Sequence, residues 1–261
     1  HYCKSGLDAS PVSQILIDAL GWSDSLLVMS AMMLIVPILA YPLRGNSSSG
    51  TQKHSDVEQS IGAALREAFG HQSYLLLTAG FFVCGFHVAF ITVHFPAYVK
   101  DLGLGGQTGA IAISIVGMMN ILGAYLSGVV GQRWSKKSSL AGIYFARAAV
   151  IAALLLAPKT EAVIYAFAFA MGILWLSTVP LTTGIVGQVF GTRYMATLFG
   201  IVFFSHQLGS FIGVWLGGWL YDQYGTYDPI WWAGVALGLL AGLIHLPIDE
   251  RPLARLAPER S

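Results

Sequence analysis

Residues 128–137 read Gly128-Val129-Val130-Gly131-Gln132-Arg133-Trp134-Ser135-Lys136-Lys137, and they lie between two segments that are each apolar enough to cross a bilayer. Three cations fall within these ten residues. Because Lys and Arg beside membrane helices favour the cytoplasmic side, the stretch predicts a short cytoplasmic loop between two membrane-spanning helices.

The composition is typical of a membrane protein, since 55% of the 261 residues are hydrophobic and only 10% are charged. A helix needs about 20 mostly apolar residues to cross the hydrocarbon core. Seven segments fit, at residues 26–41, 74–95, 109–130, 140–157, 162–186, 196–221 and 230–247, whereas residues 9–20 predict only the end of a helix. The alternation of a membrane barrel is absent, and helices satisfy their own backbone hydrogen bonds in lipid. We therefore predict an all-α polytopic membrane protein.

Other classes of protein fit poorly. The net charge of +1 and the lack of a basic domain argue against a nucleic-acid partner. Cys3 and Cys84 cannot form a disulfide framework. No two histidines are spaced four apart and no phosphate-binding glycine loop occurs, so we expect no metal site, no cofactor and no enzymatic activity.

The positive residues predict the orientation. Ten of the 14 Lys and Arg residues fall in segments assigned to one side: Arg44, Lys53, Arg66, Arg133, Lys136, Lys137, Arg193, Arg251, Arg255 and Arg260. The opposite loops carry only Lys100 and Lys159. The C-terminus and the polar segment 45–73 are therefore expected to be cytoplasmic.

The segment 45–73 is the one boundary that the sequence suggests. Residues 46–51 read as a flexible polar linker. Within residues 57–69, Ile61, Leu65 and Ala68 recur at helical spacing. This pattern suits a helix in the membrane interface, or alternatively an extension of the next span.

The loop 128–137 resembles the one between the second and third helices of each half of major facilitator superfamily transporters. That motif runs Gly, three residues, Asp, Arg, one residue, Gly, then two basic residues. It is matched at Gly128, Arg133, Lys136 and Lys137, with Gln132 in place of Asp and Ser135 in place of Gly.

The resemblance implies a partial transporter fold. Residues 1–44 would be the end of the N-terminal bundle, with part of helix five and helix six. Residues 45–73 would be the cytoplasmic linker, 74–247 the C-terminal six-helix bundle (helices seven to twelve) and 248–261 a cytoplasmic tail. The chain begins at His1 without a visible signal peptide. We expect an N-terminal half of the same protein to be missing, and to be a partner of this one.

A narrower resemblance is carried by Gly217-Gly218-Trp219-Leu220-Tyr221-Asp222, followed by Gly225-Thr226-Tyr227-Asp228. It is similar to the exit of helix eleven in the monocarboxylate-porter and oxalate–formate-antiporter branch. The runs Phe86–Phe90, Trp175–Thr182 and Phe204–Gly209 resemble an uncharacterised bacterial group in that branch. Characterised carboxylate members carry a cation in helix eight or eleven, and this chain has none there. A carboxylate site would then need a cation from the missing half, a protonated histidine or neutral donors.

Polar residues inside the spans are the candidates for binding substrate or protons. His87, Phe90 and His94 share one face of the first bundle helix, although His87 could serve packing alone and His94 could simply be hydrated. His206 and Gln207 lie mid-span on different faces. Asn120 is expected to bond between helices.

Trp175 and Thr178 come shortly before Pro180, and this proline either frees carbonyls to line a cavity or forms a plain kink. Arg147 is expected to snorkel or to pair with a loop rather than to bind substrate. The repeats Gly209, Gly213, Gly217 and Gly123, Ser127, Gly131 predict close helix packing.

Together these features predict a secondary active transporter of the cell (inner) membrane that works by alternating access. Its cargo would be a small organic anion such as a monocarboxylate, moved with protons. The loop residues Gly128, Arg133, Lys136 and Lys137 would form a conformational latch. The alternatives are a transporter of a neutral or cationic solute, and a sensor that keeps the fold without transport.

Overall fold

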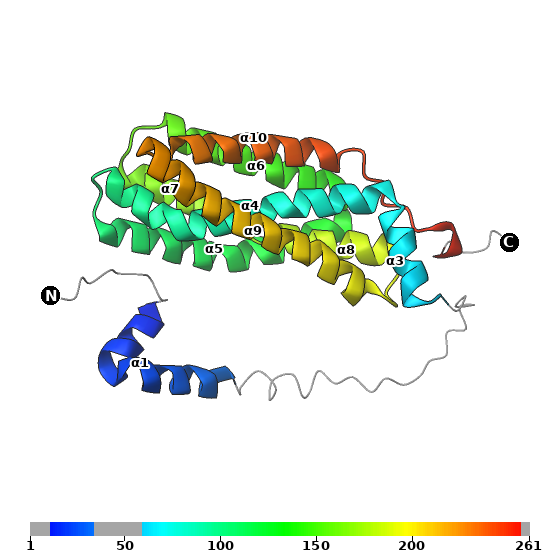
Figure 1. Cartoon of the computed structure of the whole chain (residues 1–261), viewed down its shortest axis with the longest axis horizontal. Helices are drawn as coiled ribbons and strands as arrows, with labels where there is room; N and C mark the ends of the chain where they lie inside the picture. The colour runs from blue at the N-terminus through cyan, green and yellow to red at the C-terminus, as the bar shows by residue number, and fades with distance from the viewer. Residues whose placement is uncertain (1–10, 34–58, 257–261) are drawn as a thin grey trace. The chain divides into compact units, whose positions relative to one another are not determined.

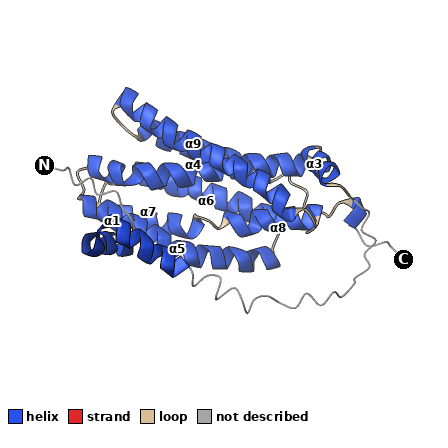
Figure 2. Ribbon diagram, turned by 60° about the horizontal axis from the view of Figure 1, so that its bottom comes forward, coloured by secondary structure: helices blue, strands red, loops and turns tan. Residues whose placement is uncertain are grey.

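The structure is a computed structural model that describes residues 11–33 and 59–256. Regular structure within these two stretches is helical, without strands (Figure 2). Residues 1–56 and 57–261 form two compact units, which are described separately. The prediction of an all-α polytopic membrane protein is confirmed.

The first unit contains α1 (Pro11–Met33), which is interrupted at Gly21. Gly21 has φ 79° and ψ 167°, a conformation that residues with a Cβ rarely adopt. Ser25 Oγ donates to the carbonyl oxygen of Gly21 at 2.5 Å. The helix end predicted for residues 9–20 coincides with this interruption. The predicted span 26–41 extends beyond the described residues.

The second unit begins with α3 (Ile61–Phe69), a separate short helix. The hydroxyl of Ser60 caps its N-terminus, and Gly70 and His71 separate it from the next helix. The segment is therefore not an extension of the following span. Its position in the membrane interface remains a prediction.

Six spans follow, each long and apolar enough to cross a membrane. They are α4 (Gln72–Asp101), α5 (Gly106–Arg133), α6 (Lys136–Leu156), α7 (Glu161–Leu174) with α8 (Thr178–Phe190), α9 (Met195–Tyr224) and α10 (Asp228–His245) (Figure 1). Helices α7 and α8 together form one interrupted span, Glu161–Phe190. The six segments predicted from residue 74 onward all coincide with these spans.

The spans pair in a symmetrical way. Helix α4 packs chiefly on α9, α5 on α7, and α6 on α10. If α4, α5 and α6 are replaced in order by the α7–α8 span, α9 and α10, and the reverse, the same three pairs result. Because the two sets start at opposite ends of the bundle, they are an inverted repeat, the arrangement of many secondary transporters.

Glycines bring α4 and α9 into close contact. A Cβ built on Gly85 would lie 1.9 Å from the carbonyl oxygen of His206, and one on Gly209 would lie 2.0 Å from that of Phe82. Ser210 Oγ donates across this crossing to the carbonyl oxygen of Gly85 at 3.2 Å. The close packing predicted from the Gly209, Gly213 and Gly217 repeat is confirmed.

The cations gather at one end of the bundle. Among the described residues, this end carries Arg66, Arg133, Lys136, Lys137, Arg193, Arg251 and Arg255, whereas the other end carries Lys100 and Lys159. Helix α3 and the 3-10 turn η2 (Ala254–Leu256) lie at the cation-rich end (Figure 1). The assignment of this end to the cytoplasm remains a prediction.

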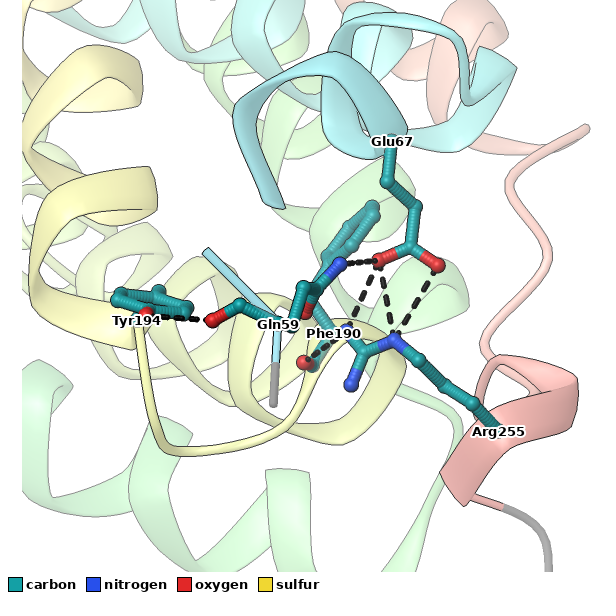
Figure 3. Close-up of polar contacts among 5 residues, drawn as sticks. All are labelled: Gln59, Glu67, Phe190, Tyr194 and Arg255. Atoms are coloured by element: carbon teal, nitrogen blue, oxygen red, sulfur yellow. Dashed lines mark hydrogen bonds and ion pairs between the residues drawn. The ribbon is translucent and has the colours of Figure 1, made fainter. Parts of the chain in front are cut away.

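An ion pair joins α3 to the C-terminal segment at that end. Arg255 Nη2 lies 2.9 Å from Glu67 Oε2 and donates to the carbonyl oxygen of Phe190 at 3.0 Å (Figure 3). Gln59 Nε2 donates to the same carboxylate at 2.8 Å, and Tyr194 Oη donates to the carbonyl oxygen of Gln59 at 2.7 Å. These contacts tie α3, η2 and the α8–α9 turn together.

Candidate functional site

The most distinctive feature of the bundle interior is the break between α7 and α8. Residues 175–177 separate the two helices near the middle of the span. Pro180 lies in the first turn of α8. It has no N–H to donate to the carbonyl four residues back, at Leu176, and its ring crowds that carbonyl. The break therefore leaves backbone groups that require partners from other helices.

Arg147 of α6 supplies two of those partners. Its Nε and Nη2 donate to the carbonyl oxygen of Leu174 at 3.1 and 2.6 Å, and Nη2 also donates to that of Trp175. Its side chain is 1% exposed, and its guanidinium lies 5.4 Å from the ring centroid of Tyr144.

The expectation that Arg147 snorkels is wrong. The carbonyls released by the break give the guanidinium hydrogen-bond acceptors inside the bundle, so it does not need to reach the membrane surface. Its Nη1 is buried and has no hydrogen-bond partner within residues 11–33 and 59–256. One donor of a buried cation is thus unused beside the break.

Asn120 of α5 braces the break from another helix. Its Oδ1 accepts a hydrogen bond from the backbone N–H of Leu176 at 3.1 Å. Ser177 Oγ donates back to the carbonyl oxygen of Ile173 at 2.5 Å, as expected for a kink whose hydroxyls bond to the backbone. The free donors and acceptors of the break are therefore bonded from α5, from α6 and from its own hydroxyl.

Thr178, at the start of α8, is fully buried against α4. Its Oγ1 lies 3.2 Å from Cys84 Sγ, and either atom can donate. Trp175 is partly exposed in the break itself. The structure thus brings together three predicted site residues, Asn120, Trp175 and Thr178, with Arg147, which we expected not to bind substrate.

The three candidate histidines do not converge on one point. His87 is buried, and its Nε2–H donates to the carbonyl oxygen of Gly234 in α10 at 2.8 Å, while Nδ1 has no hydrogen-bond partner in the described part of the chain. Nε2 of His94 bonds to the carbonyl oxygen of Val214 in α9 at 3.0 Å. Although the two share a face of α4, they bond to different helices.

Phe90 lies between these histidines in sequence and belongs to an aromatic cluster. Its ring centroid is 4.7 Å from that of the buried Trp231 and 5.6 Å from that of His94. Such edge and tilted contacts pack a core. Phe90 therefore has a structural role in this conformation.

His206 is largely buried in α9, and its neighbour Gln207 is exposed. His206 Nδ1 lies 3.2 Å from Gln207 Oε1. The imidazole ring stacks on Phe203 with centroids 5.3 Å apart and planes 4° apart. Of the candidate histidines, His206 is the one bonded to an exposed polar side chain.

The predicted latch is mostly helical rather than a loop. Gly128 to Arg133 belong to α5 and Lys136 and Lys137 to α6, so only Trp134 and Ser135 connect the helices. Lys136 Nζ donates to Gln188 Oε1 at 2.8 Å, and the backbone N–H of Lys137 donates to Glu250. Arg133 is exposed and has no ion-pair partner within residues 59–256.

Arg147 is the residue that sequence reasoning undervalued. The only available signal was a lone cation inside an apolar span. Its partners are backbone carbonyls from a distant break, which no side-chain motif could have indicated.

Comparisons with known proteins agree with this arrangement. A family model described as the Major Facilitator Superfamily matches residues 9–214. The chain is 25% identical to monocarboxylate transporter 12-B of Danio rerio, over 87% of this chain and 54% of that protein. It is 23% identical to the uncharacterised MFS-type transporter YcxA of Bacillus subtilis, over 79% of this chain and 52% of that protein.

A third relative is monocarboxylate transporter 13 of Bos taurus, which is 25% identical over 91% of this chain and 56% of its own length. The chain thus spans about half the length of the curated relatives it matches. The family match covers well over half of the chain, and the six apolar helices, their inverted repeat and the interrupted fourth span agree with it. The chain belongs to the Major Facilitator Superfamily.

Proposed function

We propose that this chain is the C-terminal part of a proton-coupled secondary transporter for a small organic anion such as a monocarboxylate. The observation that carries the proposal is the interrupted fourth span, with Arg147 and Asn120 bonded to its free backbone groups. In many transporters, discontinuous helices at mid-membrane form the substrate site. Two of the relatives described above are named monocarboxylate transporters.

An anionic substrate suits the charge of this site. The N-terminus of a helix carries a partial positive charge, and α8 begins beside Arg147. Nη1 of the guanidinium has no partner among the described residues, and a substrate carboxylate could accept a hydrogen bond from it. Arg147 would supply the cation that α9 lacks and that α5 lacks before Arg133 in its last turn.

We place the transport pathway between this bundle and a second six-helix half of the same protein. The two halves would rock about the mid-membrane site, in alternating access. Residues 1–261 alone would then not transport, because half of the pathway wall is absent. Measurable uptake by liposomes containing only this chain would contradict this part of the proposal.

We assign the coupling proton to His206 in preference to His87. His206 is bonded to the exposed Gln207, whereas His87 is enclosed and bonded to α10. A titrating group must exchange protons with water during each cycle. His206→Ala is expected to abolish the dependence of uptake on a pH gradient, and His87→Ala is expected to preserve it.

The α5–α6 turn would act as the latch. Arg133 has no ion-pair partner among the residues that the structure describes, and Lys136 is bonded to the last turn of α8. Arg133→Ala is expected to lower the maximal rate of transport more than the affinity for substrate. Unchanged turnover in this variant would refute the latch.

The proposal is tested in proteoliposomes containing the full-length protein, with an imposed pH gradient and a panel of monocarboxylates and dicarboxylates. Gradient-driven uptake of a carboxylate is expected, with a raised KM in Arg147→Lys and loss of uptake in Arg147→Met. Arg251→Gln, an exposed arginine outside the spans, is the matched control. Uptake of a neutral or cationic solute instead would overturn the substrate class, and folded protein without any uptake would favour a sensor.

We also place the protein in the cell (inner) membrane with its C-terminus in the cytoplasm. The support is the gathering of cations at the end that holds α3 and η2. A reporter that fluoresces only in the cytoplasm, fused after residue 261, is expected to be fluorescent. A dark fusion of normal abundance would reverse the orientation.

A further inference from the structure

An apolar groove lies between α5, α6 and the α7–α8 span and reaches the α7–α8 break at one end. Its volume is about 310 Å³. It is lined by Gly123, Leu126, Ser127, Val130, Trp134, Ser139, Gly142, Ile143, Ile173, Leu174, Ser177 and Leu181. The groove runs from the α5–α6 turn at the cation-rich end to the level of the α7–α8 break.

The groove offers almost no free hydrogen-bonding groups. Its three serines each donate to a backbone carbonyl three or four residues earlier in the chain: Ser127 to Ala124, Ser139 to Ser135 and Ser177 to Ile173. The rest of the lining is hydrophobic or glycine. An apolar occupant therefore suits the groove, because a polar one would find no partners there.

The length of the groove matches one leaflet of a bilayer. Along α5 it extends from Gly123 to Trp134, about 16 Å at about 1.5 Å per residue. One leaflet contributes half of a hydrocarbon core that is about 30 Å thick. Trp134, 71% exposed, lies at the mouth, where tryptophans prefer the level of the lipid headgroups.

The mouth of the groove is positively charged. Arg133 precedes Trp134 and has no ion-pair partner among the described residues. The stem of Lys136 lies against Gly184, about 3.0 Å from where a Cβ on that glycine would stand, and Gly184 is one turn from the groove residue Leu181. Within residues 59–256, the ammonium of Lys136 bonds to the neutral amide of Gln188 and to no carboxylate. Glu250 accepts from the backbone N–H of Lys137 and forms no ion pair with Arg133 or Lys136.

We propose that this groove binds one acyl chain of an anionic glycerophospholipid, whose phosphate is held by Arg133 and Lys136. The apolar wall matches the chain, and the two cations match the headgroup. Because the groove also contacts Leu174 and Ser177 at the break, a bound lipid would pack against the interrupted span.

The test is native mass spectrometry of the full-length protein, reconstituted with equal amounts of phosphatidylglycerol and phosphatidylcholine. We expect one phosphatidylglycerol to be retained preferentially. Each basic residue near a membrane strengthens binding of anionic lipid about fivefold, so Arg133→Gln combined with Lys136→Gln should lower the preference about 25-fold. Gly142→Leu should also displace the lipid, since open space lies at that position within the groove.

Arg251→Gln removes a cation of the same end outside the groove and is expected to leave the preference unchanged. Equal retention of both lipids by the unmodified protein would mean ordinary boundary lipid and would overturn the proposal. An equal loss in Arg251→Gln would do the same, by pointing to general surface charge. Retention in Gly142→Leu would overturn the groove as the site of the chain.

Discussion

The crossing of α4 and α9 yields the sharpest prediction, for the substitution Gly85→Ala. The added methyl would lie 1.9 Å from the carbonyl oxygen of His206, whereas real Cβ atoms essentially never approach closer than 3.0 Å. A backbone carbonyl cannot rotate away as a side chain can, so the helices must separate. The hydrogen bond from Ser210 to the carbonyl of Gly85 would lengthen with them.

Overpacking of a well-packed core costs about 1–3 kcal/mol, and the rigid neighbour places Gly85→Ala at about 3 kcal/mol. For domains of this size, that corresponds to a fall in the apparent Tm on the order of 5–10 °C. The assay is thermal loss of the monodisperse peak in size-exclusion chromatography in detergent.

The matched control is Gly117→Ala in α5, where no atom lies within 4 Å of the added methyl. This variant is expected to be as stable as the unmodified protein or slightly more stable, since alanine favours helices. Gly209→Ala adds a methyl to the same crossing from the α9 side. The free energy of unfolding lost by the double variant with Gly85→Ala should therefore be smaller than the sum of the losses of the two single variants. An apparent Tm of Gly85→Ala equal to that of Gly117→Ala would refute the close approach.

Three further predictions concern single polar contacts. Burial alone would raise the pKa of Glu67, but hydrogen bonds from Arg255 and Gln59 hold it below its ordinary value of 4.5. The stabilisation from this pair is therefore present above pH 4.5 and lost as the pH falls through the lower pKa of the folded state. Arg255→Ala should accordingly lower the free energy of unfolding at pH 7 by about 1 kcal/mol for this partly exposed pair, seen as a lower apparent Tm, but not in stronger acid. Asn120→Leu leaves the N–H of Leu176 without an acceptor and should cost about 1–3 kcal/mol in chemical denaturation, whereas Asn120→Asp retains an acceptor and should cost less. Tyr144→Phe removes the 2.7 Å hydrogen bond to the carbonyl of Gly80 and should cost about 1 kcal/mol by the same measurement, and no change would show that water replaces it.

Local features of the sequence were sufficient for the spans. Hydropathy is a property of consecutive residues, and the lipid core requires helices of a fixed minimum length. The segments predicted from residue 74 onward therefore coincide with α4 to α10, and the cations gather at one end as predicted. Glycines repeating every four residues likewise indicated close packing before any partner helix was known.

The candidate site was predicted only in part. Trp175 and Thr178 lie at the α7–α8 break, where the proline at position 180 disrupts the helix, so a proline in an apolar span was enough to indicate them. Asn120 reaches the same break from α5. The stretch 128–137 was read as a loop, yet most of it is helical, since Gly and cations at the end of a span do not stop the backbone from continuing its hydrogen bonds.

What the sequence determined by itself is the number of bundle spans, their limits and the distribution of charge between the two ends. What only the tertiary structure decided is which neighbour each buried polar side chain meets. His87 and His94 share one face of α4 but bond to α10 and α9, and Arg147 turns inward to the carbonyls of Leu174 and Trp175. The physical reason is that hydropathy acts on each residue separately, whereas hydrogen bonds in a bundle depend on helices distant in sequence that cover the same face.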